Sequence, residues 1–91
     1  MADINETLAE RGNSYGSFEE RCKHEQRIKV AIASGSQWAT MPDDCKCSLE
    51  MIATKISRIA DGNNPNHFDS WHDIAGYATL IADRLTSPIN P

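Results

Sequence analysis

Two stretches of helical periodicity on either side of a short loop restrict this chain more than any other feature of its sequence. From Asp43 or Asp44 to about Asp61, one face gathers the apolar residues Leu49, Ile52, Ala53, Ile56, Ile59 and Ala60. From Asp69 or Ser70 to about Leu85, a second stripe contains Trp71, Ile74, Ala75, Ala78, Ile81, Ala82 and Leu85. The segment from Gly62 to His67 has the Gly, Asn and Pro residues of a tight turn. The pattern predicts an antiparallel helix hairpin.

A third helix is expected before the hairpin, over residues 17–34. Ser17 and Glu20 have the spacing of a capping box, and Gly35 follows as a stop signal. Glycines interrupt residues 1–16, which we expect to form a loop or hinge. Trp38 lies in the irregular connection to the hairpin and is expected to cover the core as a lid.

The length and charge of the chain limit the classes of protein to which it can belong. With 91 residues, the chain has room for one all-α domain over residues 1–91, and self-association is expected because so short a chain hides only about 60% of its surface. A net charge of −4 argues against a general coat for duplex nucleic acid. No apolar run approaches the roughly 20 residues that span a bilayer. The acidic start lacks a signal peptide, so we expect a cytoplasmic protein.

The three cysteines are assigned no chemistry. Cys22, Cys45 and Cys47 are odd in number, which argues against a disulfide framework. The Cys45-x-Cys47 spacing also lacks the two-residue gap of common zinc and redox motifs.

The last predicted helix has a second distinctive face, opposite its apolar stripe. This face contains Asp69, Asp73, Gly76, Tyr77, Leu80 and Arg84. A lone helix has no reason to expose both Tyr77 and Leu80, so the pattern indicates a subunit contact, a pocket, or a pocket at a subunit contact. Gly76 supports a close approach, because a glycine inside a helix costs about 0.5 to 1 kcal/mol relative to alanine.

Basic and aromatic residues could form a site for an anionic ligand. Lys55 and Arg58 share one helix edge and can point at the same anion, although a solvated edge is the simpler interpretation. Lys29 continues a stripe of charged residues that is either a salt ladder at the solvent edge or a basic row facing the ligand. The other candidate ligand-binding residues are Tyr15, His67, Trp71 and Tyr77.

Acidic residues allow a different hypothesis. Asp69 and Asp73 lie one helical turn apart and, with Glu50, could hold Mg²⁺. The alternative is structural, because Asp69 could cap the helix and Asp73 could bond its first-turn amides. His67 and His72 could exchange protons near neutral pH, but neither identifies a reaction.

Three motifs resemble those of a family of small, mostly uncharacterised bacteriophage proteins. The motifs are Arg11-Gly12-x-x-Tyr15-Gly16-x-Phe18, Leu49-Glu50-Met51-Ile52-Ala53-x-Lys55-Ile56-x-Arg58-Ile59, and Asp69-Ser70-Trp71-x-Asp73-Ile74-Ala75-Gly76-Tyr77-Ala78. The resemblance implies a helical phage protein that acts in the host cytoplasm. The chain is also distantly similar to MazG-type all-α nucleotide pyrophosphohydrolases, which hold Mg²⁺ with acidic residues on two helices. Here the partner helix has Glu50 with Lys55 and Arg58, and lacks a second Glu at the expected spacing.

These observations order three hypotheses. A nucleotide-binding protein comes first, possibly an oligomeric sponge that sequesters a nucleotide signal of host antiviral immunity, since Lys and Arg would capture phosphate directly. It would need no cofactor. A Mg²⁺-dependent pyrophosphohydrolase comes second, and a phage inhibitor that binds a host protein comes third. Whether the protein is an enzyme stays open, with binding favoured over turnover.

Overall fold

The computed structural model describes residues 14–62 and 64–86, and side chains from residue 18 onward. Within these ranges the chain forms three α-helices, one short 3-10 helix and no strand, which confirms the all-α prediction. The elements are α2 (Ser14–Ala33), η1 (Trp38–Thr40), α3 (Asp43–Ala60) and α4 (Phe68–Thr86). The expected loop at residues 1–16 lies outside the described residues up to residue 13, and its last three residues belong to α2.

The predicted helix ends were accurate to within a few residues. α2 begins three residues before Ser17, so Ser17 lies inside the helix and the predicted capping box is wrong. α3 has Pro42 as its N-cap, with a fixed φ of −59°, and Asp43 and Asp44 occupy the first turn, where their charges favour the helix dipole. α4 likewise begins before its predicted cap, which places Asp69 in its first turn.

Hydrogen bonds hold the loop between α3 and α4. The amide of Asn66 donates to Oδ1 of Asn64 at 3.0 Å, an arrangement typical of Asn in turns. The indole Nε1 of Trp71 donates to the carbonyl oxygen of Pro65 at 2.9 Å, which ties the loop to the first turns of α4. The predicted tight connection between the two hairpin helices is therefore present.

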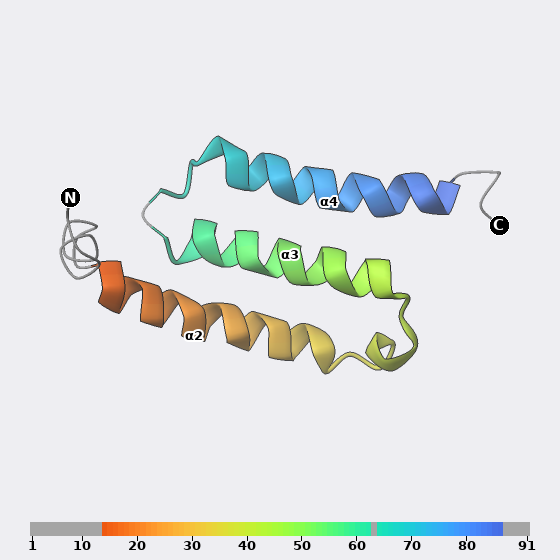
Figure 1. The fold of residues 1–91 in the computed structure, drawn as a ribbon, viewed down its shortest axis with the longest axis horizontal. Coiled ribbons are helices and arrows are strands. Elements are labelled where there is room, and N and C mark those ends of the chain that lie inside the picture. The colour runs from red at the N-terminus through yellow and green to blue at the C-terminus, as the bar shows by residue number, and fades with distance from the viewer. Residues whose placement is uncertain (1–13, 63, 87–91) are drawn as a thin grey trace, which may run out of the picture.

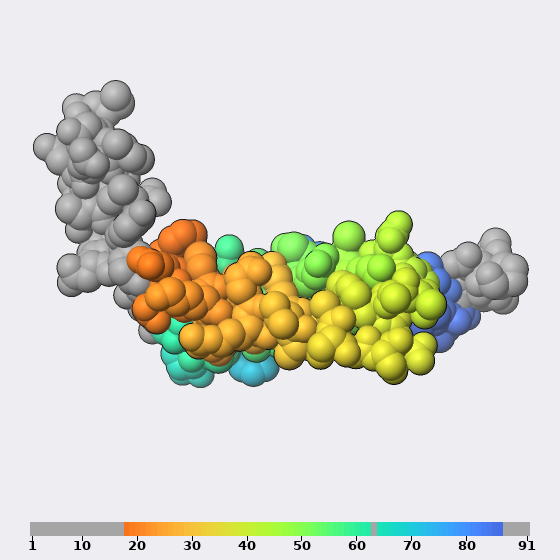
Figure 2. All heavy atoms as spheres, turned by 90° about the horizontal axis from the view of Figure 1, so that it is seen from below, coloured from red at the N-terminus to blue at the C-terminus, as the bar shows by residue number. Residues whose placement is uncertain are grey.

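The three α-helices lie side by side in one layer (Figure 1). α3 is central and packs against both α2 and α4, and α2 also contacts η1. Successive helices run in opposite directions, so the predicted hairpin of α3 and α4 is present and α2 extends it (Figure 1). In Figure 2, where α2 faces the viewer, α3 and α4 lie behind it in the same band.

Small side chains occupy the contacts between the helices. Within the described residues, the buried ones are Ala53, Ser48, Ser57 and Ser70, and Ala53 is the single apolar residue among them. Small residues let neighbouring helix axes approach closely. The described residues therefore enclose no hydrophobic core, because they leave both broad sides of the layer uncovered.

One broad side of the layer is charged. Two ion pairs connect α3 to α4 on this side, Lys55 with Asp73 and Asp44 with Arg84. In each helix the two paired residues are about three turns apart and therefore lie on one side. Glu25 and Lys29 of α2 and Arg58 of α3 belong to the same side by helical position. We call the seven residues the charged face.

The opposite side of the layer is apolar. By helical position it contains Leu49, Ile56 and Ala60 of α3 and Trp71, Ala75, Ala78, Ala82 and Leu85 of α4. We call this set the apolar face. Its α4 residues were predicted to pack against the neighbouring helix of the hairpin, and this part of the prediction is wrong, because all five are exposed. α4 instead turns Ser70, Ile74, Tyr77 and Ile81 toward α3, and the two ion pairs link the helices in this orientation.

No described helix is long and apolar enough to cross a membrane.

Candidate functional site

A hollow in the described surface of α4 is lined by predicted site residues and their neighbours. It has a volume of about 390 Å³ and is lined by His72, Asp73, Gly76, Tyr77 and Leu80. A Cβ atom added to Gly76 would meet no atom within 4 Å. The close approach that we expected at this glycine is therefore not made by the described part of the chain. The space above Gly76 is therefore open to a ligand or to another part of a protein.

Lys55 of α3 and Asp73 of α4 form an ion pair beside this hollow. The Nζ of Lys55 lies 3.0 Å from Oδ2 of Asp73, and the lysine side chain is only 13% exposed, whereas that of Asp73 is 41% exposed. The lysine stem is thus held between the helices while its partner carboxylate borders solvent and the hollow. A ligand anion could replace the carboxylate, because Asp73 can turn toward water.

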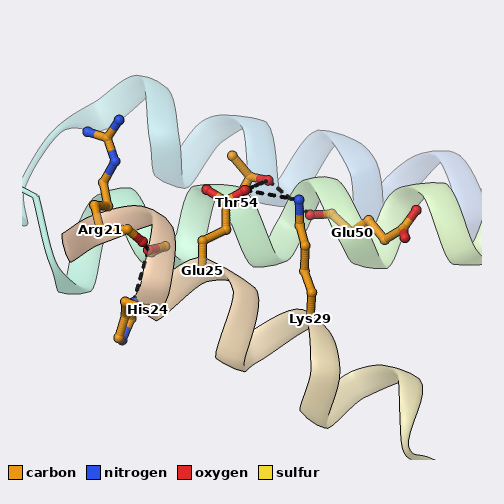
Figure 3. Close-up of polar contacts among 7 residues, drawn as sticks. Arg21, His24, Glu25, Lys29, Glu50 and Thr54 are labelled. Carbon is orange, nitrogen blue, oxygen red and sulfur yellow. Dashed lines mark hydrogen bonds and ion pairs between the residues drawn. The ribbon is translucent and has the colours of Figure 1, made fainter. Parts of the chain in front are cut away.

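A second group of polar residues joins α2 to α3 on the charged face (Figure 3). The Nζ of Lys29 lies 3.0 Å from Oε2 of Glu25, and the hydroxyl of Thr54 donates to the same oxygen at 3.2 Å. Burial alone would raise the pKa of Glu25, but Lys29, Thr54 and the charge of Arg58 together lower it from its ordinary value of 4.5. Lys29 is therefore a structural partner of Glu25, which agrees with the salt-ladder interpretation.

Arg58 is the most available cation of the predicted site. It is exposed, and within the described residues no hydrogen bond or ion pair holds it. Its charge nevertheless reaches Glu25, whose pKa it helps to lower. Arg58 and Lys55 are one turn apart on α3, and their joint approach to one anion stays a prediction.

The ion pair between Asp44 and Arg84 joins the start of α3 to the end of α4, at the end of the hairpin opposite its loop. The Nε of Arg84 contacts one carboxylate oxygen of Asp44, and Nη2 donates to the other at 3.0 Å, so the pair is bidentate. Burial would raise the pKa of Asp44, but the hydrogen bonds and charge of Arg84 lower it and in turn raise the pKa of the guanidinium. The pair explains why Arg84, on the predicted second face of α4, points toward α3.

The structure separates the three predicted metal ligands. In Figure 3 the carboxylate of Glu50 points away from Glu25 and Lys29. Asp69 is exposed in the first turn of α4, and Asp73 is engaged by Lys55. Among the residues that the structure describes, no three His, Cys, Asp or Glu side chains come together in a group that could hold a metal ion.

The remaining predicted ligand residues are distributed along the chain. His67 precedes α4, with its Nδ1 3.4 Å from the hydroxyl of Ser70. Trp71 lies on the apolar face, away from the hollow, so it is not placed to stack on a ligand there. Tyr77 lines the hollow. The side chain of Tyr15 lies outside the described residues.

One buried polar contact was not predicted. Ser57 is fully buried, its hydroxyl donates to the carbonyl oxygen of Arg21 at 3.2 Å, and Nδ1 of His24 lies 2.9 Å from the same hydroxyl. Thr54 and Ser57 lie on the polar edge of α3 that faces α2. The polar residues of this edge were the sequence signal for the contact, but they are as typical of a solvent-exposed edge as of a polar contact between two helices.

Comparison with known proteins identifies the family of the chain. No curated protein and no solved structure matches it. The sequence model of one family, described as Domain of unknown function (DUF6378), matches residues 2–85, nearly the whole chain. The chain belongs to this family, DUF6378.

Proposed function

We propose that this protein binds a phosphorylated small molecule, a nucleotide, over the hollow on α4, with Lys55 and Arg58 holding its phosphates. The observation that carries the proposal is the arrangement of Lys55 beside the hollow. There, a mostly buried lysine is neutralised by a carboxylate that can move into solvent. The hollow is lined by α4 alone, so the phosphates of the ligand would extend from it toward α3.

The lining residues support this ligand class. Gly76 allows a flat group to approach the helix backbone, because the space above it holds no side chain. Tyr77 gives an aromatic surface beside that space. Arg58 can add charge-assisted hydrogen bonds to phosphate oxygens, which are roughly twice as strong as neutral ones. A nucleotide offers both the flat base and the phosphate that these residues suit.

Binding without turnover is the form of the proposal that the charged face favours. A hydrolase of the Mg²⁺-dependent kind needs several acidic ligands around the metal, whereas the acidic residues of this face each lie beside a basic partner. In the phage setting implied by the sequence motifs, tight binding of this kind would sequester a nucleotide signal of the host's antiviral immunity in its cytoplasm.

Native mass spectrometry with a panel of mononucleotides and cyclic nucleotides, with and without Mg²⁺, tests the proposal. We expect stoichiometric binding of intact nucleotide. Arg58→Ala should weaken binding about 10-fold to 100-fold, the equivalent of about 1.5 to 3 kcal/mol for a hydrogen bond to a charged group. Lys23→Ala is the matched control, because Lys23 is an exposed cation on α2 whose partners are Glu19 and Glu20.

Three results would contradict the proposal. Release of pyrophosphate or phosphate would indicate the hydrolase instead. Equal losses in Arg58→Ala and Lys23→Ala would show general charge attraction and no site on α3. Absence of binding across the whole panel, together with capture of a host protein in the absence of any small molecule, would favour the inhibitor hypothesis.

A further inference from the structure

The apolar face leaves large side chains in water. Ile56 is 39% exposed, Trp71 54% and Leu85 67%. Ala75, Ala78 and Ala82 lie between them along α4 and are also exposed. Stable helical domains bury such stripes between two packed layers, and the described chain has one layer. Within residues 14–62 and 64–86, nothing covers this side of the layer.

The size of the apolar face is at the lower end for a specific protein interface. α3 has 18 residues, which gives a helix about 27 Å long at 1.5 Å per residue. The two helices that carry the face, with axes 8 to 10 Å apart, make it roughly 16 to 20 Å wide, so it covers roughly 400 to 550 Å². Two such faces in contact bury about 1,000 Å² in total, the area that a specific interface should reach.

The composition of the apolar face favours a second copy of the same chain as its occupant. The residues of α3 and α4 on this face are aliphatic side chains, alanines and one tryptophan, so a twofold contact between the two faces places apolar groups on apolar groups. The exposed alanines also let helices of the two copies approach closely.

We propose that two copies stack apolar face against apolar face around a twofold axis and form a two-layer, six-helix dimer. Both charged faces and both hollows then point outward. The ligand site proposed above would lie outside the subunit contact, with one complete site in each subunit. The dimer itself does not depend on that ligand, because different residues form it.

Two substitutions on α4 test whether its apolar face or its hollow forms the subunit contact. Ala78→Arg adds a charge to the apolar face, whereas Leu80→Arg adds one beside the hollow, where Leu80 is 65% exposed. Both replace an exposed apolar residue by Arg, so they are chemically matched. In sedimentation velocity, we expect the wild type and Leu80→Arg to have the mass of two chains, and Ala78→Arg to associate at least 100-fold more weakly.

A measurement on the wild type covers the case in which Ala78→Arg does not fold. The melting temperature of a dimer that unfolds on dissociation rises with protein concentration. A 100-fold increase corresponds to about 2.7 kcal/mol, which for two chains of this size is a shift of roughly 5 to 11 °C. An unfolded Ala78→Arg with a folded, dimeric Leu80→Arg and this shift supports the proposal.

Three outcomes would overturn the proposal. A wild type with the mass of one chain and a melting temperature independent of concentration would show that the apolar face needs no second copy. Retention of the dimer by Ala78→Arg would place the contact elsewhere. Dissociation of Leu80→Arg with an intact Ala78→Arg would assign the contact to the hollow.

Discussion

Replacing Gly76 by alanine tests two properties of α4 at once. A glycine inside a helix costs about 0.5 to 1 kcal/mol relative to alanine, because it loses more conformational freedom on folding. Within the described chain, no contact of Gly76 compensates for this cost, because a Cβ atom at this position would meet no other atom within 4 Å. Gly76→Ala should therefore stabilise the protein by about 0.5 to 1 kcal/mol.

The size of this gain is measurable by thermal unfolding. In a domain of 60 to 100 residues, about 1 kcal/mol shifts the melting temperature by 4 to 8 °C, so we expect a rise of about 2 to 8 °C. Far-ultraviolet circular dichroism at one fixed protein concentration is the assay, because association would otherwise change the midpoint. Gly62→Ala is the control, since its Cβ would collide with the carbonyl oxygen of Arg58, and its melting temperature should fall.

The second readout is ligand binding. The new methyl group would occupy the part of the hollow that lies over Gly76, so a nucleotide that binds there should bind more weakly while the protein becomes more stable. A fall in melting temperature would refute the reasoning, because it would mean that Gly76 already packs against another surface. A rise in stability with unchanged nucleotide affinity would separate the ligand from the hollow.

Two further predictions concern the contact between α2 and α3. Ser57→Ala should lower the free energy of unfolding by about 1 to 3 kcal/mol, because it removes the hydrogen-bond partner of His24 in a buried contact. Urea denaturation measures this change. Ser36→Ala is the control, because Ser36 is exposed and its replacement should have no comparable effect. Glu25 has a folded-state pKa below its ordinary value of 4.5, so its contribution to stability should be complete above about pH 4.5 and disappear as the pH falls through the lowered pKa. Glu25→Gln should lose less stability than the wild type over that acidic range, and an unchanged pH profile would contradict the assigned role of Lys29 and Thr54.

The helices were predictable because their signals are local. The periodic apolar residues of α3 and the Gly, Asn and Pro residues of the loop between α3 and α4 each act within a few residues of the backbone that they determine. The rotation of α4 was not predictable in the same way. It depends on Asp44 meeting Arg84 and Lys55 meeting Asp73, contacts between residues distant in sequence. The apolar stripe of α4 predicted burial against α3, but most of it is exposed in the described chain, because periodicity identifies an apolar side of a helix and does not show which surface covers it.

The ion pair between Lys55 and Asp73 changes the meaning of two sequence hypotheses. Lys55 was proposed as a phosphate ligand and Asp73 as a metal ligand, as if each were independent. Since the two side chains neutralise each other at 3.0 Å, anything that takes one of them must release the other. Release of Asp73 costs little because its side chain is 41% exposed and water can solvate it. Release of Lys55, which is 13% exposed, leaves a mostly buried charge that needs a new anion. The asymmetry favours a phosphate at Lys55 over a cation at Asp73.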